Sequence, residues 1–278
     1  MKKTVVVPTD FSNNALVAAK YALRFAAQLD YDVHFLHAYQ PFTSAFQNPR
    51  AIEQDKNKIK QEAEADMDNF VTSLDPDNSS KTSSSIAPGS LVDALSQFVQ
   101  SHTVALIIMG THGASGTKKN VLGSNTYDVA KSSLVPLLVV PEHVAAFSLN
   151  KAVFFTDYQP SDKKTLQALQ KVLSDRPIPC TLVHIVPHDK EAPSQHQRLE
   201  EWQQQLKAET GYELLYSQIV QDRENLERVN LITDELAADL ILLTLVGGRG
   251  FIEKLIHKSL ARQIILDPKR PVLLVTGS

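Results

Sequence analysis

Residues 104–113 read VALIIMGTHG, an apolar run that ends in Gly110, with a second glycine at Gly113, and Gly123-Ser124 follow nine residues later. An all-apolar run of this length predicts a strand covered on both faces, as in a parallel sheet flanked by helices. Glycines after such a strand let backbone N–H groups approach a ligand closely. A serine at the start of the next helix adds a hydroxyl and the positive end of the helix dipole, so this stretch predicts a cradle for phosphate oxygens.

Strands and helices are expected to alternate around this stretch. Alternation of this kind requires a parallel sheet with helices on both faces. Helical spacing of apolar residues begins after Ser12 or Asn13 and again after Ser90, which are suitable N-cap residues. The strands are expected at 5–7, 33–39, a polar segment 79–86, 104–109 and 137–140, and the helices at 13–29, 52–74, 90–98 and 124–132.

The second half of the chain repeats the first. Asp157 and His184 match Asp10 and His37 at an offset of 147, and the apolar run after Pro271 matches the run after Pro136 at an offset of 135. Such self-similarity indicates a duplicated unit. The sequence therefore predicts an α/β fold of two tandem five-stranded parallel-sheet α/β sandwich domains. Their expected ranges are 1–145 and 146–278, with 142–149 as the linker; the second copy would have strands at 152–156, 179–186, 213–220, 239–244 and 271–276 and helices at 161–174, 195–209 and 225–237.

Composition excludes several classes of protein. A net charge of -3 without a basic block leaves no electrostatic footprint for nucleic acid. No apolar stretch approaches the length of a membrane span, and the N-terminal run before Pro8 is too short for a secretory signal. The single cysteine, Cys180, cannot form an internal disulfide and is expected to be buried. A cytoplasmic location fits these features.

Three features lie at the carboxyl ends of predicted strands. Asp10 follows the first strand, Ala38 ends the second, and Gly110 follows the fourth. Ligands of open parallel sheets bind outside the carboxyl ends of the strands, where the strand order reverses. A carboxylate at Asp10 can accept hydrogen bonds from ribose, the backbone of Ala38 can read a base edge, and the glycine loop can hold phosphates. Asp10 is equally suited to cap the following helix, and His37 and His184 are interpreted as structural.

At these residues the chain resembles the universal stress protein family in its tandem two-domain form. The ATP-binding version of that family carries Gly, two residues, Gly, nine residues and then Gly-Ser or Gly-Thr. Here the pattern is met by Gly110, Gly113, Gly123 and Ser124, and the start Val7-Pro8-Thr9-Asp10 also matches. The resemblance covers essentially the whole chain.

The resemblance implies a Rossmann-like, adenine nucleotide alpha hydrolase-like fold that binds ATP in the first half as a stress-responsive signal or switch. Asp10 would contact ribose, Ala38 adenine, and Met109 would pack near the base. No motif has metal-ligand spacing, so Mg²⁺ or Mn²⁺ would arrive only with the phosphates. The implied ATP-binding residues are Pro8, Thr9, Asp10, Ala38, Met109, Gly110, Thr111, His112, Gly113, Gly123, Ser124 and Asn125.

The second copy departs from this pattern. At the offset of 135, Leu245 replaces Gly110 and Lys258 replaces Gly123, so side chains are expected where the first copy leaves backbone bare. The second half is therefore expected to be a partner that does not bind nucleotide. The apolar strands 136–140 and 271–275 are expected to pair edge to edge, forming a pseudo-dimer within one chain. Association of two chains stays open.

Two other functions remain open at this point. A nucleotide-independent dimerisation or interaction module would use the fold without the glycine pattern, as the second half does. A weak ATP-hydrolysing enzyme would need a catalytic group, for which His112 is a candidate. No motif places a base or a nucleophile, and neither a P-loop nor a dinucleotide fingerprint is present, so a catalytic role is not expected.

Overall fold

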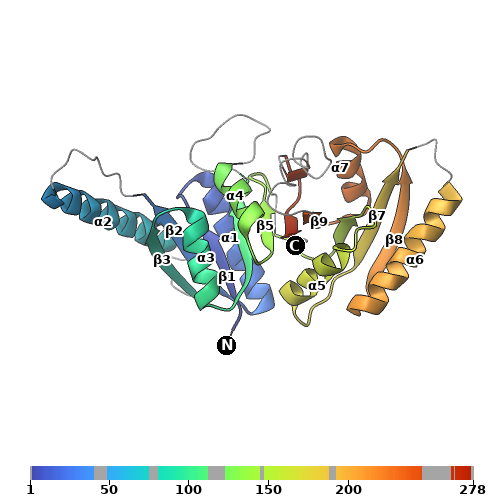
Figure 1. Ribbon diagram of the computed structural model, residues 1–278, viewed down its shortest axis with the longest axis horizontal. Coiled ribbons are helices and arrows are strands. Elements are labelled where there is room, and N and C mark those ends of the chain that lie inside the picture. Colours follow the sequence, from blue (N-terminus) through green and yellow to red (C-terminus); the bar gives the residue numbers. More distant parts are fainter. Residues whose placement is uncertain are drawn as a thin grey trace.

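The strands form one continuous sheet in the computed structural model, in the order β3-β2-β1-β4-β5-β10-β9-β6-β7-β8 (Figure 1). The structure describes residues 2–40, 49–74, 81–111, 123–144, 147–187, 192–245, 264–265 and 267–276. The first half contributes β1 (Thr4–Pro8), β2 (Asp32–Tyr39), β3 (Thr82–Pro88), β4 (Val104–Gly110) and β5 (Leu137–Val140). The second contributes β6 (Ala152–Phe155), β7 (Cys180–Val186), β8 (Leu215–Gln221), β9 (Leu240–Leu245) and β10 (Val272–Thr276).

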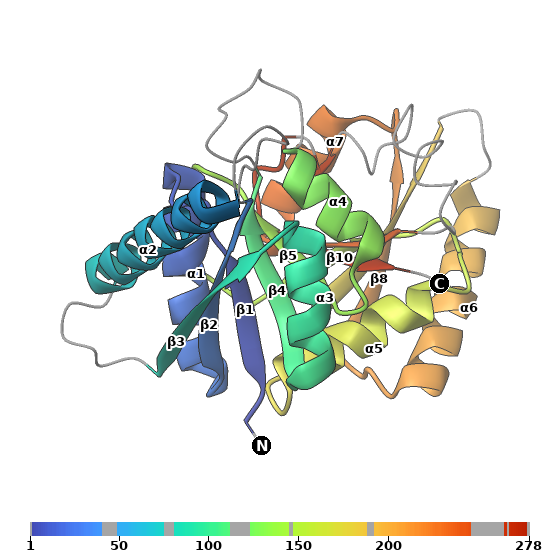
Figure 2. The same cartoon turned by 60° about the vertical axis from the view of Figure 1, so that its left-hand side comes forward.

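Helices cover both faces of this sheet. Buried residues of α1 (Asn13–Leu29), α2 (Pro49–Leu74), α5 (Asp162–Leu173) and α6 (Ala192–Thr210) pack in one core cluster. Those of α3 (Leu91–Ser101), α4 (Ser124–Ser132) and α7 (Leu226–Glu235) pack in a second cluster. Figure 2 shows α3 and α4 on the near side of β4 and α1 on its far side. The predicted α/β class is therefore confirmed, including the polar segment that becomes β3.

Within each half, neighbouring strands are parallel and the strand order is the same. The exception to parallel pairing lies between the halves, where β5 and β10 run antiparallel, with Leu138 opposite Leu273. The expected edge-to-edge pairing of the two last strands is thus present in the structure. It joins two five-stranded arrangements into one sheet, while the exact domain limits at 145 and 146 stay a prediction.

Local capping explains where the central helices begin. The side chain of Ser12 accepts a hydrogen bond from the backbone N–H of Ala15, which satisfies one otherwise orphaned donor of α1. Ser90 does the same for the N–H of Asp93 at the start of α3, and its hydroxyl donates to the Asp93 carboxylate at 2.6 Å. Of the cap residues expected from the sequence, Ser12 and Ser90 cap these two helices in the structure.

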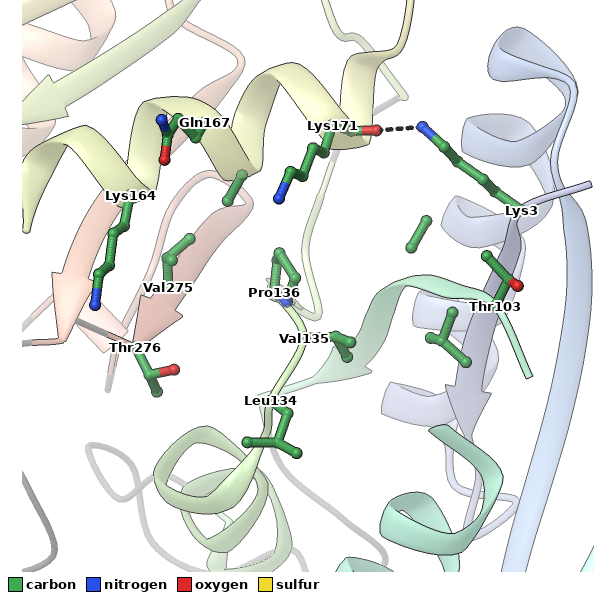
Figure 3. Close-up of a pocket in the computed structure, with 13 residues that line it drawn as sticks. Lys3, Thr103, Leu134, Val135, Pro136, Lys164, Gln167, Lys171, Val275 and Thr276 are labelled. Atoms are coloured by element: carbon green, nitrogen blue, oxygen red, sulfur yellow. Dashed lines mark hydrogen bonds between the residues drawn. The ribbon is translucent and has the colours of Figure 1, made fainter. Parts of the chain in front are cut away.

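A polar clasp ties the two halves together at the end of α5. The ammonium of Lys3 donates to the carbonyl of Lys171 at 2.7 Å (Figure 3) and to Ser174 Oγ at 3.0 Å. The Tyr31 hydroxyl donates to the carbonyl of Val172 at 2.8 Å. These donors satisfy carbonyls that a helix C-terminus leaves without partners, and the lysine charge complements the negative end of the helix dipole.

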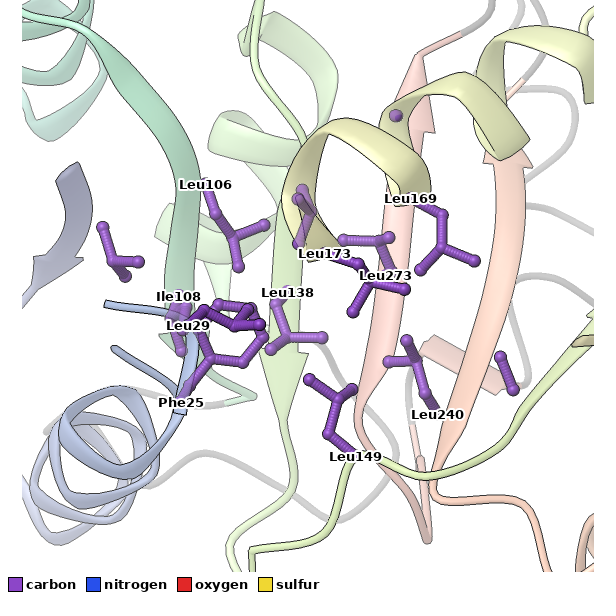
Figure 4. Packing of buried hydrophobic residues seen from close by; sticks show 14 of the residues in the cluster. Phe25, Leu29, Leu106, Ile108, Leu138, Leu149, Leu169, Leu173, Leu240 and Leu273 are labelled. Atoms are coloured by element: carbon purple, nitrogen blue, oxygen red, sulfur yellow. The ribbon is translucent and has the colours of Figure 1, made fainter. Parts of the chain in front are cut away.

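Apolar side chains fill the space between α1, α5 and the central strands. Leu106, Leu138 and Leu273 come from β4, β5 and β10, and Figure 4 shows them between Phe25 on α1 and Leu169 on α5. One core cluster thus spans both halves. Of the helices in the described part of the chain, none has the length and apolar character needed to cross a membrane.

A buried histidine lies under α3. The ring of His34 on β2 stacks on Phe98 at 4.2 Å, and its two nitrogens hydrogen-bond with Ser83 and Ser85 at 2.8 Å each. Burial lowers the pKa of His34 to about 4, with a smaller contribution from the positive charge of His102. The imidazole therefore stays neutral in the folded protein at neutral pH.

Replacing Tyr31 by Phe should lower the free energy of unfolding by about 1 kcal/mol, because the helix-end carbonyl of Val172 loses its donor. Urea unfolding followed by circular dichroism measures this change. The matched control is Tyr216→Phe at a half-exposed position on β8, which should change little. Equal losses in the two variants would contradict a stabilising clasp.

His34 should make the protein less stable in mild acid. Its pKa is depressed in the folded state, so stability is complete above the unfolded pKa of about 6.5. Between that pH and about 4 only the unfolded chain gains the proton, which should remove about 2–3 kcal/mol. Unfolding titrations at pH 7 and 4.5 measure the slope. His34→Phe should flatten it, whereas His143→Gln at an exposed site should not.

Candidate functional site

Several predicted ligand residues lie at the carboxyl ends of the central strands of the first half. Pro8 ends β1, Ala38 lies near the end of β2, and Gly110 ends β4. These three strands are parallel, so their carboxyl ends face the same side. The strand order reverses between β1 and β4, which is where open α/β sheets bind ligands. His112 and Gly113 lie outside the described residues.

The turn after β1 is held by its own side chains. The Thr9 hydroxyl accepts from the N–H of Phe11 at 3.0 Å, and a carboxylate oxygen of Asp10 accepts from the N–H of Ser12 at 3.1 Å. Phe11 has a φ of 64°, a left-handed conformation that these two bonds stabilise. Asp10 therefore shapes the turn ahead of α1, and Ser12, two residues later, is the helix cap.

His37 on β2 also holds the turn after β1. Its Nδ1–H donates to the carbonyl of Thr9 at 2.8 Å, and its ring lies 4.4 Å from that of Phe11. The structural role expected for His37 is confirmed, because its imidazole hydrogen-bonds to the Thr9 carbonyl and packs against the Phe11 ring. The side chain fixes Thr9 and Asp10 relative to β2.

The start of α4 is tethered to the end of β4. The Thr126 hydroxyl donates to the carbonyl of Gly110 at 3.0 Å, and the N–H of Gly123 donates to the carbonyl of Thr111, also at 3.0 Å. Helix α4 begins at Ser124 with Gly123 as its cap, no side-chain cap bond and no acidic residue in its first turn. Ser124 and Asn125 are exposed at this end of the helix. Thr126 was missed by the sequence analysis.

Gly110 has a structural reason to be glycine. A Cβ at this position would lie 2.9 Å from the carbonyl oxygen of Asn14 and 3.1 Å from its carbonyl carbon. The backbone of α1 therefore approaches the end of β4 too closely for any side chain. The glycine was expected to expose backbone to a ligand, and the structure shows that it also seats the first turn of α1.

Met109 and Ala38 belong to one apolar cluster on the α3 and α4 face. Met109 is buried, and Ala38 packs against the cluster as a partly buried residue. Thr9 and Thr111 are buried as well, although they are polar. The site therefore has an apolar side next to its polar turns.

The second copy keeps the hydrogen bonds that hold the turn after the first strand. Thr156 accepts from the N–H of Tyr158 at 2.9 Å, and His184 donates to the Thr156 carbonyl at 2.8 Å. Tyr158 has a φ of 59°, and its ring lies 4.5 Å from that of His184. Each contact repeats one made by Thr9, Phe11 and His37, which confirms His184 as structural.

The residue that replaces Gly110 in the second copy is Thr244. Val6 pairs with Ile107, and its equivalent Val153 pairs with Ile241, so β9 is displaced by one residue from the offset of 135. The expected replacement of Gly110 by Leu245 is therefore wrong. Lys258 lies outside the described residues. Thr244 and Gly110 both face the first helix of their half, where Thr244 Oγ1 lies 2.7 Å from Thr165 Oγ1.

A buried carboxylate distinguishes the second copy. Asp162 occupies the place of Ala15 in the helical stripe and is 2% exposed. It accepts hydrogen bonds from the Thr156 hydroxyl, from Trp202 Nε1 at 3.3 Å and from Thr244 at 3.3 Å. Burial raises its pKa, against the opposing effect of these donors. An acidic residue at a core position of a helical stripe is the sequence signal that could have revealed it.

Two further acidic groups stand at this end of the second half. Asp157 lies 3.6 Å from the His184 ring nitrogen. Partial burial and the negative charge of Asp157 raise the pKa of Glu224. Within the described residues, no group of three or more His, Cys, Asp or Glu side chains has the geometry of a metal site.

Comparisons of the sequence and of the structure with known proteins point to the same family. The model of the universal stress protein family matches residues 1–141. A universal stress protein of Methanocaldococcus jannaschii is 30% identical over 155 residues, which cover 50% of this chain and 95% of that protein. A solved universal stress protein of Archaeoglobus fulgidus covers 99% of this chain and 98% of its own, with a TM-score of 0.75 and 18% identity, and so shares the fold. Another from that organism, solved in complex with dAMP, covers 45% of this chain and 97% of its own at 19% identity and a TM-score of 0.36.

Replacing Gly110 by Ala should lower the free energy of unfolding by about 1–3 kcal/mol, because the new Cβ meets backbone atoms of Asn14 that cannot rotate away. Denaturant unfolding measures the loss. Ser124→Ala, at an exposed position of the same site, should stay within about 0.5 kcal/mol of the parent. A Gly110→Ala variant as stable as the parent would show that this close approach carries no constraint.

Proposed function

The chain belongs to the universal stress protein family, and on that premise we propose that its first half binds ATP at the carboxyl ends of β1, β2 and β4. The observation that carries this proposal is the start of α4, tethered to Gly110 and Thr111 at the point where the strand order reverses. The second half acts as a partner that binds no nucleotide. The two units are residues 1–145 and 146–278.

The start of α4 suits the phosphates. A helix N-terminus presents backbone N–H groups and a positive dipole end to an anion. The first turn of α4 carries no acidic residue and no side-chain cap that would compete for those groups. Gly123, Ser124 and Asn125 stand at this end, and the two tethers to β4 hold it in place. His112 and Gly113 would complete the loop around the phosphates.

Asp10 suits the ribose. One of its oxygens accepts from Ser12, and a carboxylate has further lone pairs that can accept hydrogen bonds from the two ribose hydroxyls. The Asx-type turn and the bond from His37 to Thr9 keep this carboxylate in position. Adenine would lie against Ala38 and Met109, where the apolar cluster reaches the site edge.

The charges of the second half argue against a second nucleotide site. The negative charge of Asp157 acts on Glu224 in the second half, and Asp162 is buried there against the Thr156 hydroxyl. In the first half the place of Asp162 is taken by Ala15. Asp157 matches Asp10, so the difference between the halves lies in Glu224 and Asp162, two additional carboxylates that would disfavour a triphosphate nearby. One ATP per chain is the expected stoichiometry.

The bound nucleotide would act as a signal by shifting a population of states. ATP would favour one arrangement of the phosphate-binding loop and of the interface between the two halves. At one hundred times the dissociation constant, binding would stabilise the folded state by about 2.7 kcal/mol. No residue is proposed as a base or nucleophile, so hydrolysis forms no part of the proposal. Mg²⁺ or Mn²⁺ would be held by the phosphates.

Calorimetric titration with ATP, GTP and AMP should show one site per chain and a preference for ATP. Asp10→Ala should weaken ATP binding on the order of 10- to 100-fold, since charge-assisted bonds to ribose are lost. Gly123→Leu should abolish binding, because a side chain would cover the phosphate position.

The control is Asp157→Ala, the equivalent substitution in the second half, which should leave ATP affinity unchanged. Unfolding titrations verify that each variant is folded. Absence of ATP binding to the parent protein would favour a nucleotide-independent interaction module instead. A loss of affinity in Asp157→Ala equal to that in Asp10→Ala would place the nucleotide elsewhere.

A further inference from the structure

A cleft of about 420 Å³ lies between the two halves (Figure 3). One wall is α5, the other is formed by the residues that enter β4 and β5, and the end of β10 lies between them. The cleft touches β4 at Thr103–Ala105, whereas the proposed nucleotide site is at Gly110. At about 3.3 Å per residue, the two sites lie at opposite ends of the same strand.

The walls combine positive charge with apolar surface. Lys164, Gln167, Ala168 and Lys171 line the cleft at helical spacing, so one face of α5 is presented to it. The facing wall contributes Val104, Ala105, Val135 and Pro136, and β10 contributes Val275. Lys3 also lines the cleft, and no acidic side chain is among the lining residues that the structure describes.

The lysines reach different parts of the cleft. The Lys3 ammonium bonds to the carbonyl of Lys171 and to Ser174. Figure 3 shows the side chain of Lys171 extending toward Pro136 and that of Lys164 toward the end of β10. Leu134 also lines the cleft and is 84% exposed, which is unusual for a large apolar side chain. The cleft thus offers an apolar interior with cationic groups on one wall.

The pairing of β5 with β10 relates this cleft to a filled site in the other half. In that half, the stripe on α1 that matches the α5 stripe is Val17, Lys20, Tyr21 and Arg24. There Phe147, from the segment that connects the halves, packs on Tyr21 at 4.9 Å between ring centroids and on Phe25 at 6.5 Å. An aromatic side chain therefore covers α1 where the cleft opens beside α5.

A difference in side-chain size contributes to the cleft. Ala168 stands where α1 has Tyr21, which removes a large ring from the wall. Beside α1, the aromatic ring of Phe147 fills the corresponding space. Beside α5, that space is a cleft with Lys164 and Lys171 on its wall.

We propose that this cleft binds a small amphipathic anion, with an aromatic or aliphatic body against Val104, Val135 and Ala168 and a carboxylate or sulfonate head against Lys164 and Lys171. Its volume lies within the range of about 300–1,000 Å³ that is usual for small-molecule sites. The ligand would contact both halves at once, so its binding would stabilise their arrangement in the sheet.

The test uses the full chain with two probes, the aromatic sulfonate 8-anilinonaphthalene-1-sulfonate and the aliphatic carboxylate decanoate. Fluorescence titration should show saturable binding of one sulfonate per chain, displaced by decanoate and unaffected by ATP. The double variant K164E/K171E should bind at least about tenfold more weakly, because both head-group contacts reverse sign. Gln167→Phe should also lose binding, because a ring then fills the cleft as Phe147 fills the other side.

The matched control is K20E/R24E, which places the same charge change on the equivalent stripe of α1 and should bind like the parent. Unfolding curves show whether each variant is folded. The proposal is overturned if the parent shows no saturable binding up to about 1 mM, or if ATP displaces the probe, which would place it in the nucleotide site. It is also overturned if K164E/K171E loses binding while Gln167→Phe keeps it, since that pattern indicates surface charge alone.

Discussion

The antiparallel pairing of β5 with β10 is the constraint on which the rest of the structure depends. Leu137–Val140 and Val272–Val275 are buried, and each strand completes the sheet of the other half. Without its partner, each would expose an apolar edge with unpaired backbone groups, which invites association with another chain. The pairing moves the free edges of the sheet outward to β3 and β8. The serine-rich sequence of β3 then makes sense, because an outer edge is best kept polar.

Duplication has preserved the turn geometry and changed the electrostatics. Thr9, Phe11 and His37 are matched bond for bond by Thr156, Tyr158 and His184. The divergence lies where the first helix of each half crosses the fourth strand. Ala15 and Gly110 leave that crossing small and uncharged in the first half, whereas Asp162 and Thr244 make it a buried polar network in the second. The two halves thus share one fold and differ in the polarity and charge of this crossing.

Local pattern predicted the elements well and their mutual register less well. Apolar periodicity and the serines at 12 and 90 located the strands and helix starts within a few residues, since these depend on neighbouring residues only. Which residue of β9 matches a given residue of β4 depends on how these strands pair with β6 and β1. A constant sequence offset carries no information on that pairing. The close approach of Asn14 to Gly110 and the tether from Thr126 likewise arise only when distant segments meet. The sequence therefore predicted which residues form the candidate site, and the structure supplied contacts between them that depend on the tertiary fold.

The connection between the halves breaks their symmetry. A chain that leaves β5 at Val140 must reach β6 at Ala152, and Phe147 and Leu149 pack into the core along this path, on the side of α1. Tyr21 on α1 accommodates that path by stacking on Phe147, while the matching position on α5 is Ala168. On the α5 side, Lys3 and Tyr31 bind the helix end instead of an apolar segment covering its flank. Among the described residues, the two flanks of the duplicated sheet therefore differ, because the linker packs on α1 whereas a lysine-lined cleft lies beside α5.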